Sequence, residues 1–395
     1  MRAAYCIGLL SAIVLGTLGL AAAGAADKEL VGRVTATVPP DTPAAVSITR
    51  QGETTPTTVT QPQTEVNGGD VITTGEGATA LLEVRLPDLG VEADVIVSPQ
   101  SSVQANFVEH SPKAPNFLVR IGRAIIRLLR GRADGGTQTV AASSTGTAYQ
   151  VEAARDGTST ITVLEGTVSA GLRGGLRPLA GLRRVTQASQ LKVGRLGLLL
   201  PNPALITDPK LLEAPLRALA TYLPKLDPHW ASLTGLPAGQ KPDQRALDLA
   251  VEALLAGAGL TGQQRDQAGN ALASLGLFKA ATDSYAEAQK LDPALASAVT
   301  LKMAGASYLV GNEEQASNLL TQALVSQPAN ARANGAMAWL LAPKDPTQAQ
   351  HYLNMAQSGP VRLDTAITNA LSTRIHTSPA LRRIAPRPVT EGGTK

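Results

Sequence analysis

Residues 276–293 read GLFKAATDSYAEAQKLDP, and residues 311–328 read GNEEQASNLLTQALVSQP. Four residues of the first stretch recur thirty-five residues later: Gly276, Ala281, Ala288 and Pro293 as Gly311, Ala316, Ala323 and Pro328. A third, weaker unit places Ala349 and Ala356 thirty-three residues further on. Small residues are needed where neighbouring helices approach closely, and a proline ends the second helix of a pair. The spacing predicts stacked helix pairs.

A period of about 34 residues resembles tetratricopeptide repeats, whose helix pairs stack into a solenoid. The resemblance implies a concave groove, lined by the first helix of each pair, that receives a peptide or helix. Carried over unit by unit, it points to six groove residues: Gln263, Asp266, Asn270, Leu301, Tyr308 and Asn334. The alternative is that three repeats serve only as a spacer or as a dimerisation surface.

The residue composition changes after Gly197, where Ala and Leu at spacings of three and four replace β-branched residues. This pattern is typical of helices and predicts amphipathic ones at 208–223 and 243–257. We assign 196–242 to a helical linker or cap, with a linker or ordered loop at 224–242, and 243–378 to the repeats. The Pro-, Arg- and Gly-rich tail at 379–395 has little to bury and is expected to be disordered.

Residues 30–195 carry a different pattern, dense in Thr, Val and Gly. Apolar and polar residues alternate in short runs such as 34–38 and 82–86, which indicates strands. Glycine-containing turn signals, among them Gly68-Gly69-Asp70, separate the runs. The predicted fold class is therefore a multidomain α and β protein, with an N-terminal all-β domain of short strands followed by an α-helical solenoid.

Four landmarks in this β region resemble the FecR-type periplasmic domain in order and spacing. They are GDVITTG at 69–75, LVRIGRA at 118–124, GTAYQV at 146–151 and VLEGTV at 163–168. The resemblance implies an envelope interaction or scaffold domain. We find neither the cytoplasmic segment that acts on a sigma factor nor the transmembrane helix that follows it in FecR signalling proteins. Signalling to a sigma factor is therefore not carried over.

The N-terminus has the layout of a secretory signal peptide. Arg2 precedes an uncharged run over 3–26, and Ala23-Gly24-Ala25 offers the small residues that a signal peptidase accepts. We predict a cleaved signal peptide at 1–25 and a location in the periplasm or at the outer membrane or cell surface. The mature chain then contains no cysteine, because Cys6 is removed. An uncleaved anchor is the alternative, since the run exceeds the roughly 20 residues that span a bilayer.

Signals for catalysis, metals and cofactors are missing from the sequence. The four histidines are scattered, no mature cysteine could join them at a zinc site, and no glycine-rich loop has nucleotide-binding spacing. We therefore expect no enzyme activity, no metal and no cofactor. A formal net charge of +4 over 395 residues does not by itself imply nucleic acid, and export would remove that partner.

A run of arginines without an intervening acidic residue allows two interpretations. The five residues are Arg120, Arg123, Arg127, Arg130 and Arg132. They could form a basic surface for lipopolysaccharide, anionic lipid or an acidic partner. Within a FecR-type domain, however, this segment should be strands, and the arginines would be the solvated face of an alternating strand. Any membrane contact is expected to be peripheral.

These features together predict an exported, non-enzymatic envelope adaptor that binds other envelope proteins through the FecR-like domain and the repeat groove. The partner could also be a second copy, in which case the protein would be a structural subunit that self-assembles into an envelope complex or filament. A cell-wall or glycan-binding module is a third reading. Aromatic residues make up only 3% of the chain, which disfavours that module.

Overall fold

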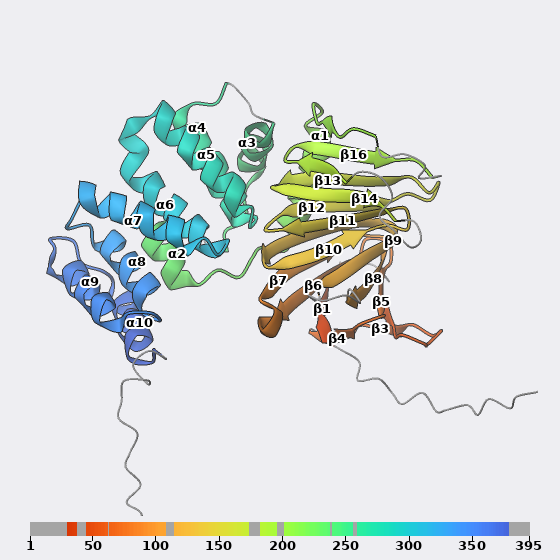
Figure 1. Cartoon of the computed structure of the whole chain (residues 1–395), viewed down its shortest axis with the longest axis horizontal. Coiled ribbons are helices and arrows are strands. Elements are labelled where there is room, and N and C mark those ends of the chain that lie inside the picture. Colours follow the sequence, from red (N-terminus) through yellow and green to blue (C-terminus); the bar gives the residue numbers. More distant parts are fainter. Residues whose placement is uncertain are drawn as a thin grey trace, which may run out of the picture.

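A computed structural model describes residues 30–37, 45–61, 63–107, 114–173, 182–195, 201–237, 239–255 and 259–378. Strands occupy the chain up to Leu205, and helices follow from Lys210 to His376 (Figure 1). This arrangement confirms the predicted fold class. The predicted signal peptide and the predicted disordered tail lie outside the described residues. Within those residues, every helix is too short or too polar to cross a membrane.

The β half consists of short strands, as predicted, with one exception sixteen residues long. The strands are β1 Leu30–Thr37, β2 Val46–Thr49, β3 Thr57–Thr58, β4 Thr64–Asn67, β5 Val71–Thr74, β6 Thr79–Leu86, β7 Val91–Val97, β8 Ser102–Phe107, β9 Pro115–Arg130, β10 Arg132–Gly136, β11 Val140–Thr145, β12 Ala148–Ala153, β13 Ser159–Glu165, β14 Thr167–Leu172, β15 Arg183–Thr186, β16 Ser189–Val193 and β17 Ala204–Leu205. The last strand pairs with β16, so the sheet extends beyond the predicted end at residue 195.

The strands pair in two rows that share the long strand β9. Row one is β4-β1-β6-β7-β9-β12-β13-β16-β17. Row two is β3-β2-β5-β8-β9-β10-β11-β14-β15. Apolar side chains such as Val34, Leu82 and Val119 form one fully buried aliphatic cluster drawn from both rows. Because apolar and polar residues alternate along each strand, every row has one apolar face that points into this core.

Strand β9 passes from row two to row one at Gly122. The backbone there has a φ of +83°, and a Cβ atom would lie 2.2 Å from the Ser101 hydroxyl oxygen. That hydroxyl in turn accepts a hydrogen bond from the Arg123 N–H at 2.9 Å. Only glycine combines this conformation with such a close approach. The glycine of the LVRIGRA landmark therefore allows one strand to serve both rows.

The helical half contains ten described helices. They are α1 Lys210–Leu219, α2 Pro228–Thr234, α3 Gln244–Leu254, α4 Gly262–Ser274, α5 Phe278–Leu291, α6 Ala296–Leu309, α7 Glu313–Ser326, α8 Ala331–Leu341, α9 Pro346–Ser358 and α10 Thr365–His376. Consecutive helices from α3 to α10 pack against one another. The predicted pairs correspond to α4/α5, α6/α7 and α8/α9. The predicted helices at 208–223 and 243–257 correspond to α1 and α3, whereas the predicted linker at 224–242 contains the additional helix α2.

Helices pack on the outer face of row one. Ile96, Ile125 and Leu164 point away from the aliphatic core of the β half and share a buried cluster with Leu216 of α1 and Leu275. The residues on the two sides are far apart in sequence, so only the fold brings them together. Apolar burial of this kind joins the two halves into one body.

A buried arginine lies at the centre of this junction. Arg127 on β9 is 1% exposed, and its Nη2 donates to Oδ2 of Asp94 on β7 at 2.5 Å. The same guanidinium donates to two backbone carbonyl oxygens of the helical half, that of Leu275 at 2.6 Å and that of Tyr222 at 3.0 Å. We call these four residues the interdomain seam. Burial raises the pKa of Asp94, but the guanidinium groups of Arg127 and Arg85 outweigh it and lower that pKa overall.

The seam depends on the turn glycine of the first repeat. Gly276 follows Leu275 directly, has a φ of +76°, and would carry a Cβ atom 3.0 Å from Arg127 Cδ. Gly311, the corresponding turn residue of the second repeat, also has a positive φ but faces open space. The first repeat glycine therefore serves both the helix turn and the contact with Arg127.

Arg120, Arg123, Arg130 and Arg132 are exposed, as expected for the solvated face of strands. Arg123, Ile125 and Arg127 alternate onto the same outer face of row one, but the helices cover that face at Ile125 and Arg127 and leave Arg123 exposed.

Glu165 makes a second polar contact across the junction. Its side chain is buried, and Oε1 accepts a hydrogen bond from the Lys279 N–H in the first turn of α5 at 3.0 Å. The residue at the N-cap of α5, Leu277, gives no side-chain cap, so a carboxyl of the β half caps this helix instead. Burial raises the pKa of Glu165 to about 8, although the N–H groups of Lys279 and Ala280 oppose the shift.

Replacing Arg127 by methionine should lower the free energy of unfolding by about 3–5 kcal/mol, because it leaves two buried carbonyl groups without their donor and the buried Asp94 carboxylate with Arg85 alone. Urea unfolding of the mature chain measures the loss. The double variant Arg127→Met/Asp94→Leu should recover part of it, since the buried carboxylate is then gone and Arg85, its other partner, is partly exposed to solvent. Unchanged stability in the single variant would show that the seam contributes nothing.

Stability should also fall with rising pH through Glu165. Its folded-state pKa of about 8 exceeds the ordinary glutamate value of 4.5, so the folded protein retains a proton that the unfolded chain loses. Between those values the free energy of unfolding should fall by about 1.4 kcal/mol per pH unit from this group. Glu165→Gln should remove that slope while keeping an oxygen acceptor for Lys279. Denaturation at pH 5 and pH 8 tests this, with the exposed Glu76→Gln as the control that retains the slope.

Candidate functional site

The first helices of the three pairs, α4, α6 and α8, form the predicted groove of the helical half. Helix α2 packs on α6 and α8, although it precedes them by more than sixty residues. In Figure 1 the green α2 accordingly lies among the later, blue helices. The groove over the second and third pairs is therefore already occupied by a helix of the same chain.

Local sequence defines both ends of α2. The Asp227 carboxylate accepts hydrogen bonds from the N–H groups of His229 and Trp230, at 2.9 and 3.3 Å. Pro228 occupies the first helical position, where no N–H is needed. Gly235 ends the helix in the left-handed conformation with a φ of +78°. The helix has only seven residues, too few to be stable in isolation, so packing in the groove must hold it.

Two side chains of α2 fill the groove. Trp230 is 1% exposed and Leu233 is fully buried, and both share one cluster with Leu301 on α6 and Met337 on α8. The Trp230 ring also lies 4.6 Å from the ring of Tyr308, centroid to centroid. Burial of two such side chains contributes roughly 3–6 kcal/mol to holding α2 in place.

Glycines form the floor beneath α2. A Cβ atom on Gly305 would lie 2.6 Å from the Thr234 hydroxyl oxygen, and one on Gly335 would lie 2.6 Å from Leu233 Cδ2. Both glycines are buried within helices, where glycine is disfavoured by about 1 kcal/mol relative to alanine. The close approach of α2 gives them a physical role.

Polar atoms of α2 find partners on the groove helices. The Trp230 indole N–H donates to the carbonyl oxygen of Gly305 at 3.3 Å. At the other end, Arg332 Nε donates to the carbonyl oxygen of Leu233 at 3.2 Å. A helix leaves its last carbonyl groups without partners, and Arg332 supplies one. The groove thus binds a helix through apolar burial together with one acceptor and one donor.

Three predicted groove residues lie close to α2 or beneath it. Tyr308 is half-buried and its ring packs against that of Trp230, while Leu301, which is 4% exposed, belongs to the same buried cluster as Trp230. Asn334 is buried, and its amide donates to the carbonyl oxygens of Pro328 and Asn330. Its side chain therefore holds the start of its own helix and is not available to a ligand.

The other three predicted residues lie on α4, beyond the end of α2. Gln263 is exposed. Asp266 forms an ion pair with Lys302 of the next first helix at 2.6 Å, which connects α4 to α6. The Asn270 side chain accepts a hydrogen bond from the Tyr285 hydroxyl at 3.0 Å. The predicted set thus follows the groove but divides into an occupied part and an open part.

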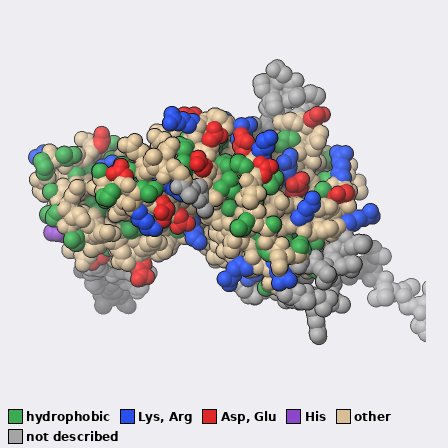
Figure 2. All heavy atoms as spheres, turned by 90° about the horizontal axis from the view of Figure 1, so that it is seen from above, with side chains coloured by type: hydrophobic (Ala, Val, Ile, Leu, Met, Phe, Trp, Pro, Cys, Tyr) green, Lys and Arg blue, Asp and Glu red, His purple; other side chains and the backbone are tan. Residues whose placement is uncertain are grey.

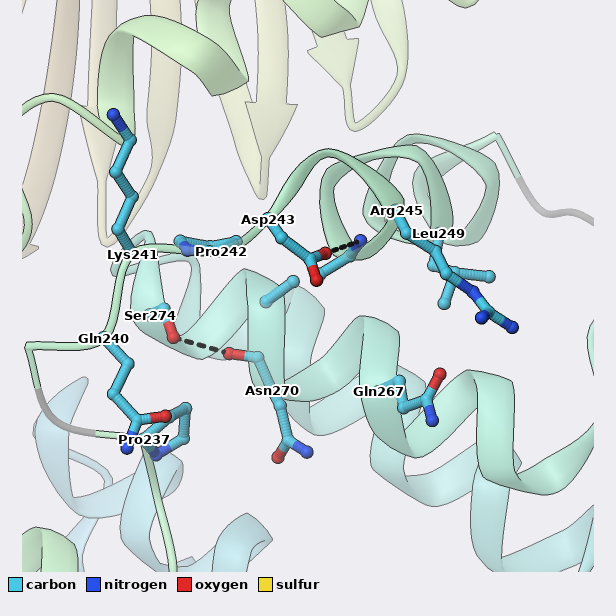
Figure 3. A pocket seen from close by; sticks show the side chains of 12 residues that line it. Pro237, Gln240, Lys241, Pro242, Asp243, Arg245, Leu249, Gln267, Asn270 and Ser274 are labelled. Atoms are coloured by element: carbon cyan, nitrogen blue, oxygen red, sulfur yellow. Dashed lines mark hydrogen bonds between the residues drawn. The ribbon is translucent and has the colours of Figure 1, made fainter.

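A hollow of about 370 Å³ lies in the open part, between the start of α3 and α4 (Figure 3). Polar and apolar side chains share its lining, and the polar ones include Lys241, Asp243, Arg245, Gln267, Asn270 and Ser274. The lining also includes Pro237 and Gln240, which follow α2 in the chain. The hollow is therefore the continuation of the groove beyond α2.

Sequence reasoning missed α2 and the basic side chains of the hollow. A signal for α2 was present, because Asp227-Pro228 is a typical helix start and Gly235 a typical helix end. Seven residues between them were too few to show helical periodicity. Lys241 and Arg245 carried no signal, since their position beside α4 depends on tertiary packing.

Arg120 of the predicted basic surface lines a separate hollow of about 350 Å³, on the β half. Arg155 and Arg195 line it too, with the hydroxyl residues Thr139 and Thr158, and no acidic side chain takes part. Figure 2 shows basic and acidic side chains interspersed over the face that it draws. Three arginines around one hollow form a local basic site without making a broad basic surface.

The described residues contain no cluster of three or more His, Cys, Asp or Glu side chains that could hold a metal ion. The carboxyl of Glu165, whose pKa burial raises to about 8, belongs to the junction between the halves.

No protein-family model and no curated protein matches this chain. Among solved structures, two crystal structures of a candidate anti-sigma factor from Parabacteroides distasonis ATCC 8503 show a partial likeness. The 1.65 Å structure is 15% identical with a TM-score of 0.30, and the match covers 37% of this chain and 64% of the other. The 2.50 Å structure is 16% identical with a TM-score of 0.28, covering 36% and 62%.

In both cases the match spans less than two thirds of the other protein's length. At this level of likeness, no activity or partner passes from that protein to this chain.

Removing the cap of α2 should loosen this helix alone. Asp227→Ala should cost about 1 kcal/mol, which corresponds to roughly fivefold faster exchange of the α2 amide hydrogens through local opening. Hydrogen exchange followed by mass spectrometry measures the effect. Asp243→Ala is the matched control, because Asp243 caps α3 through the Ala246 N–H. Unchanged α2 exchange in Asp227→Ala would contradict the role of this cap.

Proposed function

We propose that this protein is an exported, non-enzymatic adaptor of the bacterial envelope that binds a helix of another protein in the groove of its helical half. The β half, through its resemblance to FecR-type domains, provides a second contact surface. The protein acts in the periplasm or at the outer surface. It brings two envelope components together without changing either covalently.

The observation that carries this proposal is the way in which the groove holds α2. The Trp230 ring packs against the Tyr308 ring and shares a buried cluster with Leu301 and Met337. A backbone acceptor and an arginine donor meet the polar groups of the bound helix. Binding of an amphipathic helix through an apolar groove is a general mode of protein recognition. A surface that holds one helix in this way is suited to another of similar chemistry.

The β half has a basic hollow that suits an acidic partner. Arg120, Arg155 and Arg195 surround it, and charge complementarity of this kind favours fast and specific association. The hollow is lined by residues of β9, β13 and neighbouring loops, away from the interdomain seam. The two surfaces could therefore engage different partners at the same time.

Site-specific photo-crosslinking in intact cells tests the proposal. A photoreactive residue at Gln267, in the open part of the groove, should trap one envelope protein. The same residue at Gln322, an exposed position on the second helix α7, should not trap it. A further position at Arg155 probes the β half. Failure of both Gln267 and Arg155 to trap a specific protein would contradict the adaptor proposal.

Light scattering of the purified mature protein separates adaptor from assembling subunit. The adaptor is expected to remain a monomer at high concentration. Growth into large particles would favour the structural subunit instead.

A further inference from the structure

We infer that α2 is a displaceable occupant built into the chain, and that the groove over α6 and α8 is a docking site for a short helix of a partner protein that carries an aromatic residue followed three positions later by leucine. The inference rests on the proposed function and specifies the partner's chemistry. In the chain itself, Trp230 and Leu233 provide that pair.

Helix α2 is attached to the groove but is not part of the framework around it. On its N-terminal side, α1 packs with the apolar outer face of row one, and on its C-terminal side α3 packs on α4. The helix pairs from α4 to α9 contact one another directly, without α2 between them. Removal of α2 would therefore expose the groove and leave the surrounding helices in place.

The segment that carries α2 is short and is bounded by residues that permit a hinge. It lies between Pro224 and Pro242, and Gly235 and Gly239 both adopt positive φ values. A seven-residue helix makes no stable structure by itself. Release of α2 would withdraw Ala231 from the buried cluster that it shares with residues of the junction. It would also sacrifice the contacts of Trp230, Leu233 and Thr234 with the groove. Those contacts are the ones that a partner helix would replace.

The groove specifies what can replace α2. Gly305 and Gly335 allow a helix backbone to approach closely, as their contacts with Thr234 and Leu233 show. The Gly305 carbonyl oxygen accepts from an indole N–H, which favours tryptophan over phenylalanine at the aromatic position. Arg332 pairs with the carbonyl of the leucine, so the ligand helix should end soon after it. A charged residue in place of the leucine would be buried without a partner.

Covalent attachment makes α2 a strong competitor. A flexible tether of this length gives an effective concentration on the order of 1 mM. If a free helix binds the empty groove with a Kd of about 10 µM, the tethered α2 weakens its apparent binding roughly 100-fold. A partner must therefore either bind more tightly than α2 or be held nearby by a second contact. The basic hollow of the β half could provide that contact.

The test uses the full mature chain and a fluorescently labelled synthetic peptide of residues 224–237. Fluorescence anisotropy should show that the double variant Trp230→Ala/Leu233→Ala, which weakens the internal occupant, binds this peptide about 100-fold more tightly than the unaltered chain. The single variant Leu233→Ala should fall between them, and it provides the answer if the double variant does not fold. Circular dichroism and thermal unfolding confirm folding of each variant.

Two controls locate the binding. A peptide with Trp230→Ala should bind at least 10-fold more weakly to the double variant. Adding Gly335→Leu to the double variant should abolish binding, because the new side chain fills the space that Leu233 occupies. Equal peptide binding by the folded variants and the unaltered chain would overturn the inference. So would binding that Gly335→Leu leaves unchanged.

Light scattering during the same titration examines a second copy as the occupant. A monomeric double variant with bound peptide supports the inference, whereas exchange of α2 between two chains, seen as a dimer of the unaltered protein, would overturn it. The two proposals can fail separately. A specific crosslink at Gln267 without peptide binding would reject only the docking chemistry, and peptide binding without any crosslink would reject only the envelope adaptor.

Discussion

The buried guanidinium of Arg127 is the constraint on which the arrangement of the two halves depends. A charge without access to water must be paired and hydrogen-bonded, and Arg127 meets this demand from both sides of the junction. Asp94 neutralises it from the β half, while the carbonyl groups of Leu275 and Tyr222 reach it from the helical half. These directional bonds fix the position of α4 and α5 against the sheet, which apolar contact alone would leave free to slide.

From that fixed junction the helix pairs extend in order, and their groove is held at a defined place relative to the β half. Glu165 strengthens the same relationship by capping α5 from the sheet. The groove and the basic hollow around Arg120 consequently belong to one body. Such an arrangement suits a protein that holds two partners at a set separation, whereas independently moving domains would not fix that distance.

Aromatic residues are scarce in this chain, and the two tryptophans show how they are used. Trp230 fills the groove. Trp339 lies on α8, and the guanidinium carbon of Arg374 is 4.5 Å from the centroid of its ring. The core of the β half is mainly aliphatic, as the composition predicted, with Phe117 and Tyr149 as its buried aromatic residues. Both tryptophans therefore belong to the buried cluster in which α2 docks on α6 and α8. The tryptophan side chains distinguish the contact between α2 and the groove from the Ala- and Leu-rich packing of the other helices.

The sequence by itself determined the two halves, the pairing of helices and the aliphatic cores, because period-two alternation and a repeat of about 34 residues are local patterns. It also placed Leu301 and Tyr308 in a groove. Only the tertiary structure decided that Arg127 is buried and that α2 fills this groove. Both outcomes depend on contacts between residues that are far apart in the sequence. Helices α4 and α5 cover one face of β9. Helix α2 has only seven residues, too few to show periodicity, and gains its stability from helices more than sixty residues away.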